Sequence, residues 1–291
     1  MIPVRHTSPL LQLNRVHDAI GDVRARLDSA QTAASTGLRV TRPSDAPGVW
    51  SRVLSLQSSL DASVLHGTNA AQTLPLLDTA DAAMSTALET LVRAGELAVQ
   101  GASEALSDDQ LPLIADEVDA LISSLVSVGN TKFGDRYLFG GTASGVQPFD
   151  AAGTYVGNST SPTVRVSESV WIDTGFDGSS AFGAAIAALM DLSAALRTGD
   201  QSLVQAEIDN VQGADTGIIA LQGKIGVAWN QADDATVAGE SARLFLQAQI
   251  DGLIGTDPTE ALTELTAAQA AYETVLAVSA QVFEKSLFDF L

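Results

Sequence analysis

The residues best suited to catalysis or metal binding are few in this 291-residue chain, and their spacing supports no site. The histidines His6, His17 and His66 lie far apart, and none has a second histidine or an acidic residue four positions later to form a helical metal pair. The absence of cysteine excludes disulfides, thiolate catalysis and thiolate metal sites. We therefore expect solvent-facing histidines, no metal and no cofactor.

Other residue types that could do chemistry are equally unpromising. Asp108-Asp109 and Asp233-Asp234 are adjacent pairs, and neighbouring side chains on a helix point in different directions, so neither pair forms a carboxylate dyad. Gly223-Lys224 lacks the following Ser or Thr and the preceding glycine of a phosphate-binding loop. The tryptophans are expected to be packing residues: Trp50, Trp171 and Trp229. An enzyme is therefore the function class with the least support.

The most regular pattern is apolar, and it occurs at both ends of the chain. Spacings of three and four place one set of side chains on a single stripe of an N-terminal helix: Leu13, Val16, Ile20, Val23 and Leu27. A matching C-terminal stripe, interrupted by Ser279, contains Leu265, Ala268, Tyr272, Val275 and Val282. Residues 1–52 carry a net charge of +3 and residues 255–291 a net charge of −5, which favours pairing of the two ends.

The elements between these stripes are mostly helical. The first helix is expected from Pro9 to Thr36, with Gly37 as its stop and the prolines at 43 and 47 forcing a turn. Ser44 or Asp45 is expected to cap a second helix over residues 46–103. Further helices are expected after a capping box at residues 107–110, from residue 181 to 198, over a long stretch from 200 to about 254, and from 258 onward.

Residues 138–180 differ from the rest because they are rich in glycine and contain short alternating segments of strand-forming residues. Three strands are expected, at residues 155–156, 163–166 and 170–172. The predicted fold is mainly α: a long antiparallel helical bundle whose terminal helices pair as a coiled coil, with a small β insertion. Three domains are predicted: residues 1–45 with 255–291 for assembly, 46–137 with 181–254 as the bundle, and 138–180 as the insertion.

Composition limits the partners of the chain. The net charge is −20, and residues 53–291 hold 31 acidic and only 8 basic residues, so nucleic acid and anionic membranes are unfavourable partners. No apolar run reaches the ~18 residues of a membrane span, so membrane insertion is not expected. No cleavable signal peptide is apparent, so a protein acting outside the cell would need another export route.

The turn after the first helix resembles that of the flagellin family. It contains Ser35-Thr36-Gly37-Leu38-Arg39-Val40 followed by Pro43-Ser44-Asp45-Ala46-Pro47, and the two prolines are typical of hook-associated members of the family rather than of filament flagellin. Residues 132–142, Pro148-Phe149 and residues 286–291 are also similar to these members. The chain departs from the family at Ala46, where a second acidic residue is usual.

The resemblance implies an extracellular structural subunit at the junction between flagellar hook and filament. Its implied partners are copies of itself, a neighbouring hook-associated protein and flagellin, and an export chaperone before secretion without a cleaved signal. Two other functions remain open: a short flagellin that forms the filament itself, and a cytoplasmic coiled-coil adaptor. Arg93 and Leu97 match two positions of a flagellin segment recognised by an animal receptor, but Gly95 does not, and helix packing is the expected role of Leu97.

Overall fold

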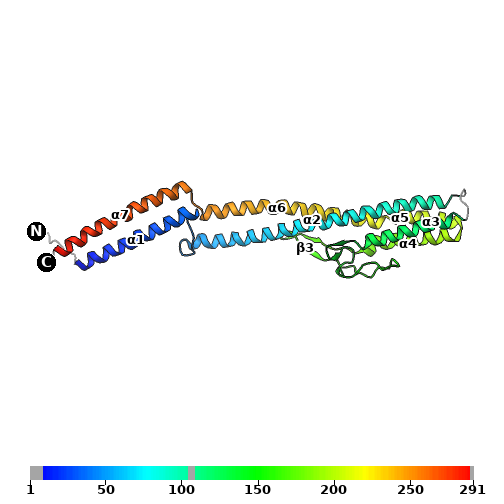
Figure 1. The fold of residues 1–291 in the computed structure, drawn as a ribbon, viewed down its shortest axis with the longest axis horizontal. Helices are drawn as coiled ribbons and strands as arrows, with labels where there is room; N and C mark the ends of the chain where they lie inside the picture. The colour runs from blue at the N-terminus through cyan, green and yellow to red at the C-terminus, as the bar shows by residue number, and fades with distance from the viewer. Residues whose placement is uncertain (1–8, 104–108, 289–291) are drawn as a thin grey trace. The chain divides into compact units, whose positions relative to one another are not determined.

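The computed structural model describes residues 9–103 and 109–288, and the side chains of residues 14–103 and 109–281. Its elements confirm the mainly helical prediction (Figure 1). In chain order they are α1 (Pro9–Thr36), α2 (Pro47–Gly101), α3 (Leu111–Gly129), β1 (Lys132–Phe133), β2 (Arg136–Tyr137), β3 (Thr163–Arg165), β4 (Trp171–Asp173), α4 (Gly178–Thr198), α5 (Gln201–Gly213), α6 (Thr216–Ile254) and α7 (Pro258–Phe288).

The chain divides into two compact units, residues 1–61 with 243–291 and residues 62–242, and helices α2 and α6 contribute to both. In the first unit, α1 and α7 lie side by side (Figure 1). The start of α2 packs against the end of α6 around the buried side chains of Val53, Leu60 and Ile250. The second unit holds the large core, to which α2 through α6 and the β3–β4 pair contribute. The three domains predicted from the sequence stay a prediction.

Several helix ends follow the expected local chemistry. Asp200 caps α5 by accepting a hydrogen bond from the backbone N–H of Ser202, and Asp257 accepts from the backbone N–H of Thr259 at 2.7 Å at the start of α7. Gly199 ends α4 with a φ of +74°, a conformation that glycine adopts without steric cost. At the start of α3, the N-cap residue Gln110 makes no side-chain capping bond, and Ser107 and Asp108 of the expected capping box lie outside the described residues.

The long helical stretch expected from residue 200 to about 254 is divided in two, because α5 ends at Gly213 and α6 begins at Thr216. Next to this break the chain meets the start of α4. A Cβ on Gly217 would lie 2.4 Å from the carbonyl oxygen of Ser180, so only glycine permits this close approach. Tertiary packing therefore overrides the helical rhythm of the sequence.

The β region contains two separate antiparallel pairs. Both strands of the β3–β4 pair were expected, and in the structure Val164 lies opposite Ile172. The β1–β2 hairpin was missed, because its two strands have only two residues each around the Gly134-Asp135 turn. Of the expected residues 155–156, Tyr155 forms only an isolated bridge with Phe149.

Aromatic rings attach the β region to the helices. The ring centroid of Phe182, on α4, lies 5.1 Å from that of Phe139 and 5.7 Å from that of Phe149, both in edge-on geometry. Tyr155 joins this cluster, and burial raises the pKa of its hydroxyl to about 12. The β region therefore shares one core with α4.

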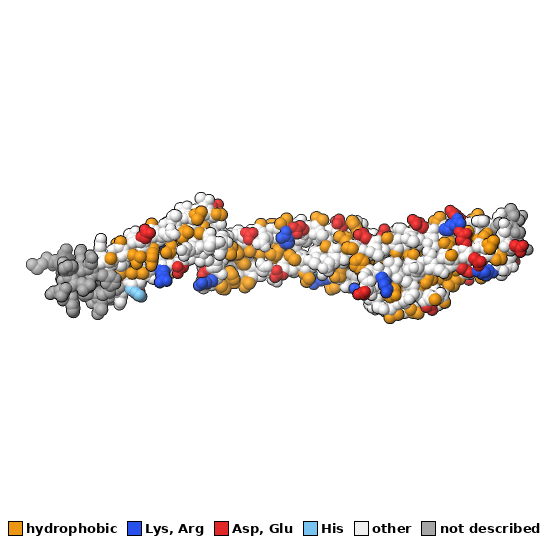
Figure 2. All heavy atoms as spheres, viewed as in Figure 1, with side chains coloured by type: hydrophobic (Ala, Val, Ile, Leu, Met, Phe, Trp, Pro, Cys, Tyr) orange, Lys and Arg blue, Asp and Glu red, His pale blue; other side chains and the backbone are white. Residues whose placement is uncertain are grey.

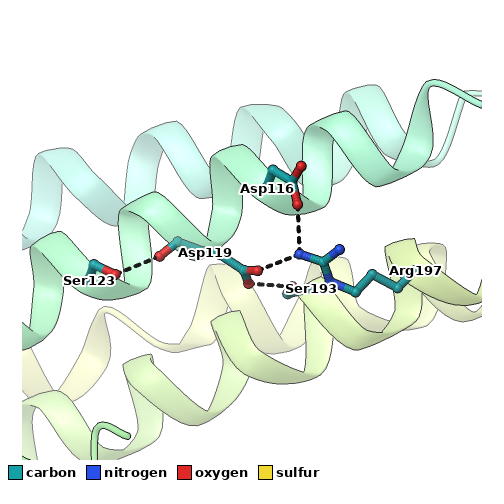
Figure 3. Close-up of polar contacts among 5 residues, drawn as sticks. All are labelled: Asp116, Asp119, Ser123, Ser193 and Arg197. Atoms are coloured by element: carbon teal, nitrogen blue, oxygen red, sulfur yellow. Dashed lines mark hydrogen bonds and ion pairs between the residues drawn. The ribbon is translucent and has the colours of Figure 1, made fainter. Parts of the chain in front are cut away.

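A polar network joins α3 to α4 (Figure 3). The carboxylate of Asp119 accepts a hydrogen bond from the buried hydroxyl of Ser193 at 2.6 Å, and its second oxygen pairs with Arg197. Arg197 also pairs with Asp116 at 2.8 Å. The hydrogen bond from Ser193, followed by Arg197, lowers the pKa of Asp119 below its usual value.

Helix α4 is long and apolar enough to cross a membrane by length and composition alone. In this structure it is a core helix, since 56% of its most apolar window is buried. Phe182, Ile186 and Leu189 are among its buried side chains. The apolar residues of α4 therefore pack in the core of the second unit.

Candidate assembly interface

The N-terminal stripe is only partly covered in the unit where α1 lies alongside α7. Val16, Ile20, Val23 and Leu27 are all half-buried, and Ala30, one turn further, is the first buried residue among the described side chains of α1. The side chain of Leu13 lies outside those described. A lone pair of helices shields only one side of each stripe, so part of this apolar surface stays in contact with water.

The C-terminal stripe is covered to the same extent. Leu265, Ala268, Tyr272 and Val275 are half-buried, while Ser279 is buried and donates its hydroxyl hydrogen bond to the carbonyl of Val275 at 2.6 Å. The side chain of Val282 lies outside those described. No ion pair joins α1 to α7 among the side chains that the structure describes, so apolar contact holds the pair together.

Helix α7 also carries apolar side chains that α1 does not cover. Leu262 is 57% exposed and Leu276 is 43% exposed, and because they lie two heptads apart they belong to one stripe. Val278 is 53% exposed on another side of the helix. By contrast, α1 exposes no large apolar residue among its described side chains. Apolar side chains are accordingly visible on the outside of the terminal pair in Figure 2.

This second stripe of α7 was not predicted from the sequence. Its signal was the 14-residue spacing of Leu262 and Leu276, which the polar residue Gln269 interrupts. We define Leu262 and Leu276 as the outer stripe of α7.

The turn between α1 and α2 is built by backbone hydrogen bonds to one carboxylate. Asp45 Oδ2 accepts from the backbone N–H of Thr41 at 3.2 Å and of Arg42 at 2.9 Å. The bond from Arg42 is the main cause that lowers the pKa of Asp45. Asp45 therefore closes the turn behind it, and the expectation that it caps α2 is wrong. Pro47 is the first residue of α2, as expected.

Two further motif residues, Gly37 and Arg39, connect this turn to the end of α6. Gly37 has a φ of +71°, and its carbonyl accepts a hydrogen bond from the backbone N–H of Thr256 at 3.0 Å. Arg39 donates from its backbone N–H to the carbonyl of Ile254 at 2.6 Å and from its guanidinium to the carbonyl of Leu253 at 3.3 Å. A cation at the last carbonyls of α6 also complements the negative end of the helix dipole. The exposed Pro43 and Ser44 lie at the outside of the turn.

The residues screened for chemistry do not converge. No group of three or more His, Asp or Glu side chains suited to a metal ion occurs within the described residues. His17 is exposed as expected, whereas His66 is half-buried and its Nδ1 atom is buried. Its neighbour Gly67 lies in close contact with Gly239 on α6. His6 lies outside the described residues.

Two tryptophans also differ from their expected packing role. Trp171 is 58% exposed, with its ring 5.8 Å from the guanidinium carbon of Arg165. Trp229 is 36% exposed and donates from Nε1 to Asp78 at 2.8 Å. Both side chains lie at the surface and contact charged residues there, rather than packing in the core.

Leu97 is buried in the core of the second unit, as expected. Its neighbour Arg93 forms ion pairs with Glu96 at 2.9 Å and with Glu117 at 2.6 Å. The pair with Glu117 joins α2 to α3. Because Leu97 is itself buried, its side chain has no surface with which to contact a partner.

Comparison with known proteins relates the chain to flagellar components. Residues 10–144 match the family model described as the bacterial flagellin N-terminal helical region. Flagellar hook-associated protein 3 of Salmonella typhimurium is 32% identical over 153 residues, which is 51% of this chain and 47%, about half, of that relative. The protein of the same name from Escherichia coli is 26% identical over 275 residues, covering 82% of this chain and 86% of the relative.

Solved structures share the fold. The crystal structure of Bacillus cereus FlgL matches 67% of this chain and 98% of its own, with a TM-score of 0.60 and 24% identity. A putative flagellar hook-associated protein from Vibrio parahaemolyticus matches 72% of this chain and 100% of its own, with a TM-score of 0.64 and 20% identity. At these identities the structural matches concern the fold alone.

Proposed function

We propose that this chain is a member of the flagellin family and a structural subunit of the bacterial flagellum that links the hook to the filament. It is a structural protein and not an enzyme, in keeping with relatives named as flagellar hook-associated proteins. The observation that carries the proposal is the α1–α7 pair, whose seam is half-covered and whose outer stripe on α7 is uncovered.

The mechanism that we propose is folding coupled to assembly. Isolated helices gain little stability from propensity alone and depend on burying an apolar face. In the free chain each terminal helix has one partner and leaves apolar surface in water. In a cylinder of many subunits, neighbouring copies would cover the same surface, and each square ångström of apolar area removed from water contributes about 25 cal/mol.

The partners implied by this role are copies of the chain itself, a neighbouring hook-associated protein and flagellin. Residues Gly37, Arg39, Pro43, Ser44, Asp45 and Pro47 are proposed to set the direction in which the chain leaves the terminal pair. The stripes proposed for assembly also contain Leu13 at the N-terminal end and Val282 at the C-terminal end. We further propose that the chain acts outside the cell, after export without a cleaved signal and with help from a chaperone.

A short flagellin that forms the filament itself is the second candidate function. It would use the same terminal helices, and the flagellin family match includes it. The names of the two curated relatives favour the junction role. Long filaments formed by the purified chain alone would support the second candidate instead.

Deletion of the gene, followed by electron microscopy and analysis of the growth medium, tests the proposal. The expected result is hooks without filaments and flagellin released into the medium, and expression of the full chain should restore attachment. A chain lacking residues 258–291 should not restore it. Filaments attached normally in the deletion strain would overturn the proposed role.

A further inference from the structure

A groove of about 850 Å³ lies in the second unit, between α2, the β1–β2 hairpin and β3. Helix α2 contributes Gln72, the hairpin contributes Phe133, Arg136 and Tyr137, and β3 contributes Thr163. The ring of Phe133 is 38% exposed, although it is a large apolar side chain. One wall of the groove is therefore aromatic and partly open to solvent.

Arg136 is the only charged residue that lines this groove. Its Nε donates to the hydroxyl of Ser144 at 3.3 Å, and no carboxylate among the described residues lies within ion-pair distance of it. Arg93 and Arg197, in the same unit, each pair with two carboxylates. The groove thus presents a guanidinium whose fork is free for a carboxylate, the geometry in which arginine binds most strongly.

A second cation reinforces the positive charge of the hairpin. The ammonium of Lys132 lies 4.4 Å from the ring centroid of Tyr137, which itself lines the groove. This cationic hairpin belongs to a chain with 35 acidic and only 15 basic residues. Two copies of so acidic a chain repel each other, so a stable contact between them needs a place where a cation of one meets an anion of the other.

We propose that the groove receives an acidic segment of a second copy of this chain, with a carboxylate on Arg136 and an apolar side chain against Phe133 and Tyr137. The inference rests on the proposed function, since a cylindrical assembly places copies side by side. It adds a contact in the second unit that is separate from the terminal helices. The juxtaposition that carries it is one arginine without an ion-pair partner, beside the exposed ring of Phe133 and the half-buried ring of Tyr137, in a groove that no carboxylate lines.

Site-directed photo-crosslinking in assembled hook–filament structures tests this contact. Because the chain has no cysteine, Gln72→Cys introduces a single thiol at the groove, which takes a benzophenone maleimide. The expected product on illumination has twice the mass of the chain, and its crosslinked peptide contains Asp or Glu. In the same background Arg136→Ala should lower the yield about tenfold, the effect of losing a charge-assisted hydrogen bond. Lys224→Ala, which removes a cation outside the groove, should leave the yield unchanged.

The outcomes separate this inference from the proposed function. If the labelled chain is present in flagella but yields no dimer, crosslinks only to another protein, or is insensitive to Arg136→Ala, the docking inference is overturned and the junction role stands. If the wild-type chain is missing from flagella, the proposed function fails and the inference falls with it. Should Gln72→Cys prevent incorporation, Thr163→Cys places the label on the opposite wall, and the same readings apply.

Discussion

At Gly37 the chain leaves α1 in a backbone conformation that other residues adopt only with strain. Its φ is +71°, and no atom lies within 4 Å of where a Cβ would be, so the requirement is conformational and not steric. Gly21, inside α1, has the same open surroundings but a helical backbone. The two positions differ in backbone conformation but not in the space around them, so a comparison of substitutions at Gly37 and Gly21 isolates the effect of conformation.

We expect Gly37→Ala to destabilise the first unit by about 1 kcal/mol, because an L-residue is strained at positive φ. Gly21→Ala should stabilise α1 by up to about 1 kcal/mol, since alanine is the better helix former. Urea denaturation followed by circular dichroism would measure both changes. Equal effects of the two substitutions would contradict the role given to Gly37.

The α3–α4 network allows a second comparison at single residues. Asp119→Ala removes the acceptor of the buried Ser193 hydroxyl and should cost about 1–2 kcal/mol. Asp116→Ala removes only an exposed contact with Arg197 and should change stability by less than about 0.5 kcal/mol. Thermal unfolding of the two variants would test this difference. A larger cost for Asp116→Ala would show that the network depends on the ion pairs instead of the buried hydroxyl.

Acid should weaken the helix ends through their capping aspartates. Backbone hydrogen bonds from Thr259 lower the pKa of Asp257 below its usual 3.8. Because the folded state holds the lower pKa, this contribution is present above pH 3.8 and is lost as the pH falls through the folded value. We expect α7 to lose helicity below about pH 4, and Asp257→Asn to reduce that acid sensitivity. Circular dichroism across pH 2–6 would measure it, and identical titrations of both proteins would contradict the assignment.

At the scale of elements, the terminal pair leaves apolar side chains of α7 uncovered. The outer stripe of α7 is exposed although α1 lies alongside. The seam residues stay a prediction of the heptad rhythm, which decides which side chains share a stripe. The outer stripe escaped prediction because a stripe of two leucines separated by Gln269 is too sparse to stand out in a sequence.

The double substitution Leu262→Ser with Leu276→Ser tests the outer stripe. Both side chains are exposed in the free chain, so helicity should change little, whereas incorporation into flagella should fall severely because neighbouring copies lose an apolar contact. Leu113→Ser, at an exposed leucine of α3, is the matched control and should incorporate normally. Quantitative blotting of purified hook–filament structures gives the comparison. Normal incorporation of the double variant would remove the outer stripe from the interface.

At the scale of the whole molecule, the sequence predicts the helices better than their interruptions. The bounds of α1 and the capping of α5 and α7 follow from local residues, and they agree with the structure. The break at residues 214–215, the β1–β2 hairpin and the burial of His66 do not follow from local residues. Each depends on a close approach between distant segments, such as Gly217 against Ser180, or on strands too short to form a pattern.

The candidate interface was predicted in part for the same reason. Its apolar stripes have a period that a sequence reveals, and the described members of both seams are half-buried in a unit where α1 lies alongside α7. The sequence does not reveal how much of each stripe is buried in the α1–α7 pair, because that burial depends on whether another helix packs beside the pair. The partial burial of the stripes is nevertheless the observation on which the proposed role in an assembly rests.

Hydrogen exchange of the backbone amides, measured by mass spectrometry on the free chain and on assembled hook–filament structures, tests the central claim most directly. We expect α1 and α7 to exchange rapidly in the free chain and to become at least about 100-fold slower in the assembly, because neighbours cover their stripes. The core helices α3 and α4 should be protected in both states and serve as the internal control. Terminal helices that are equally protected in the free chain and in the assembly would contradict folding coupled to assembly.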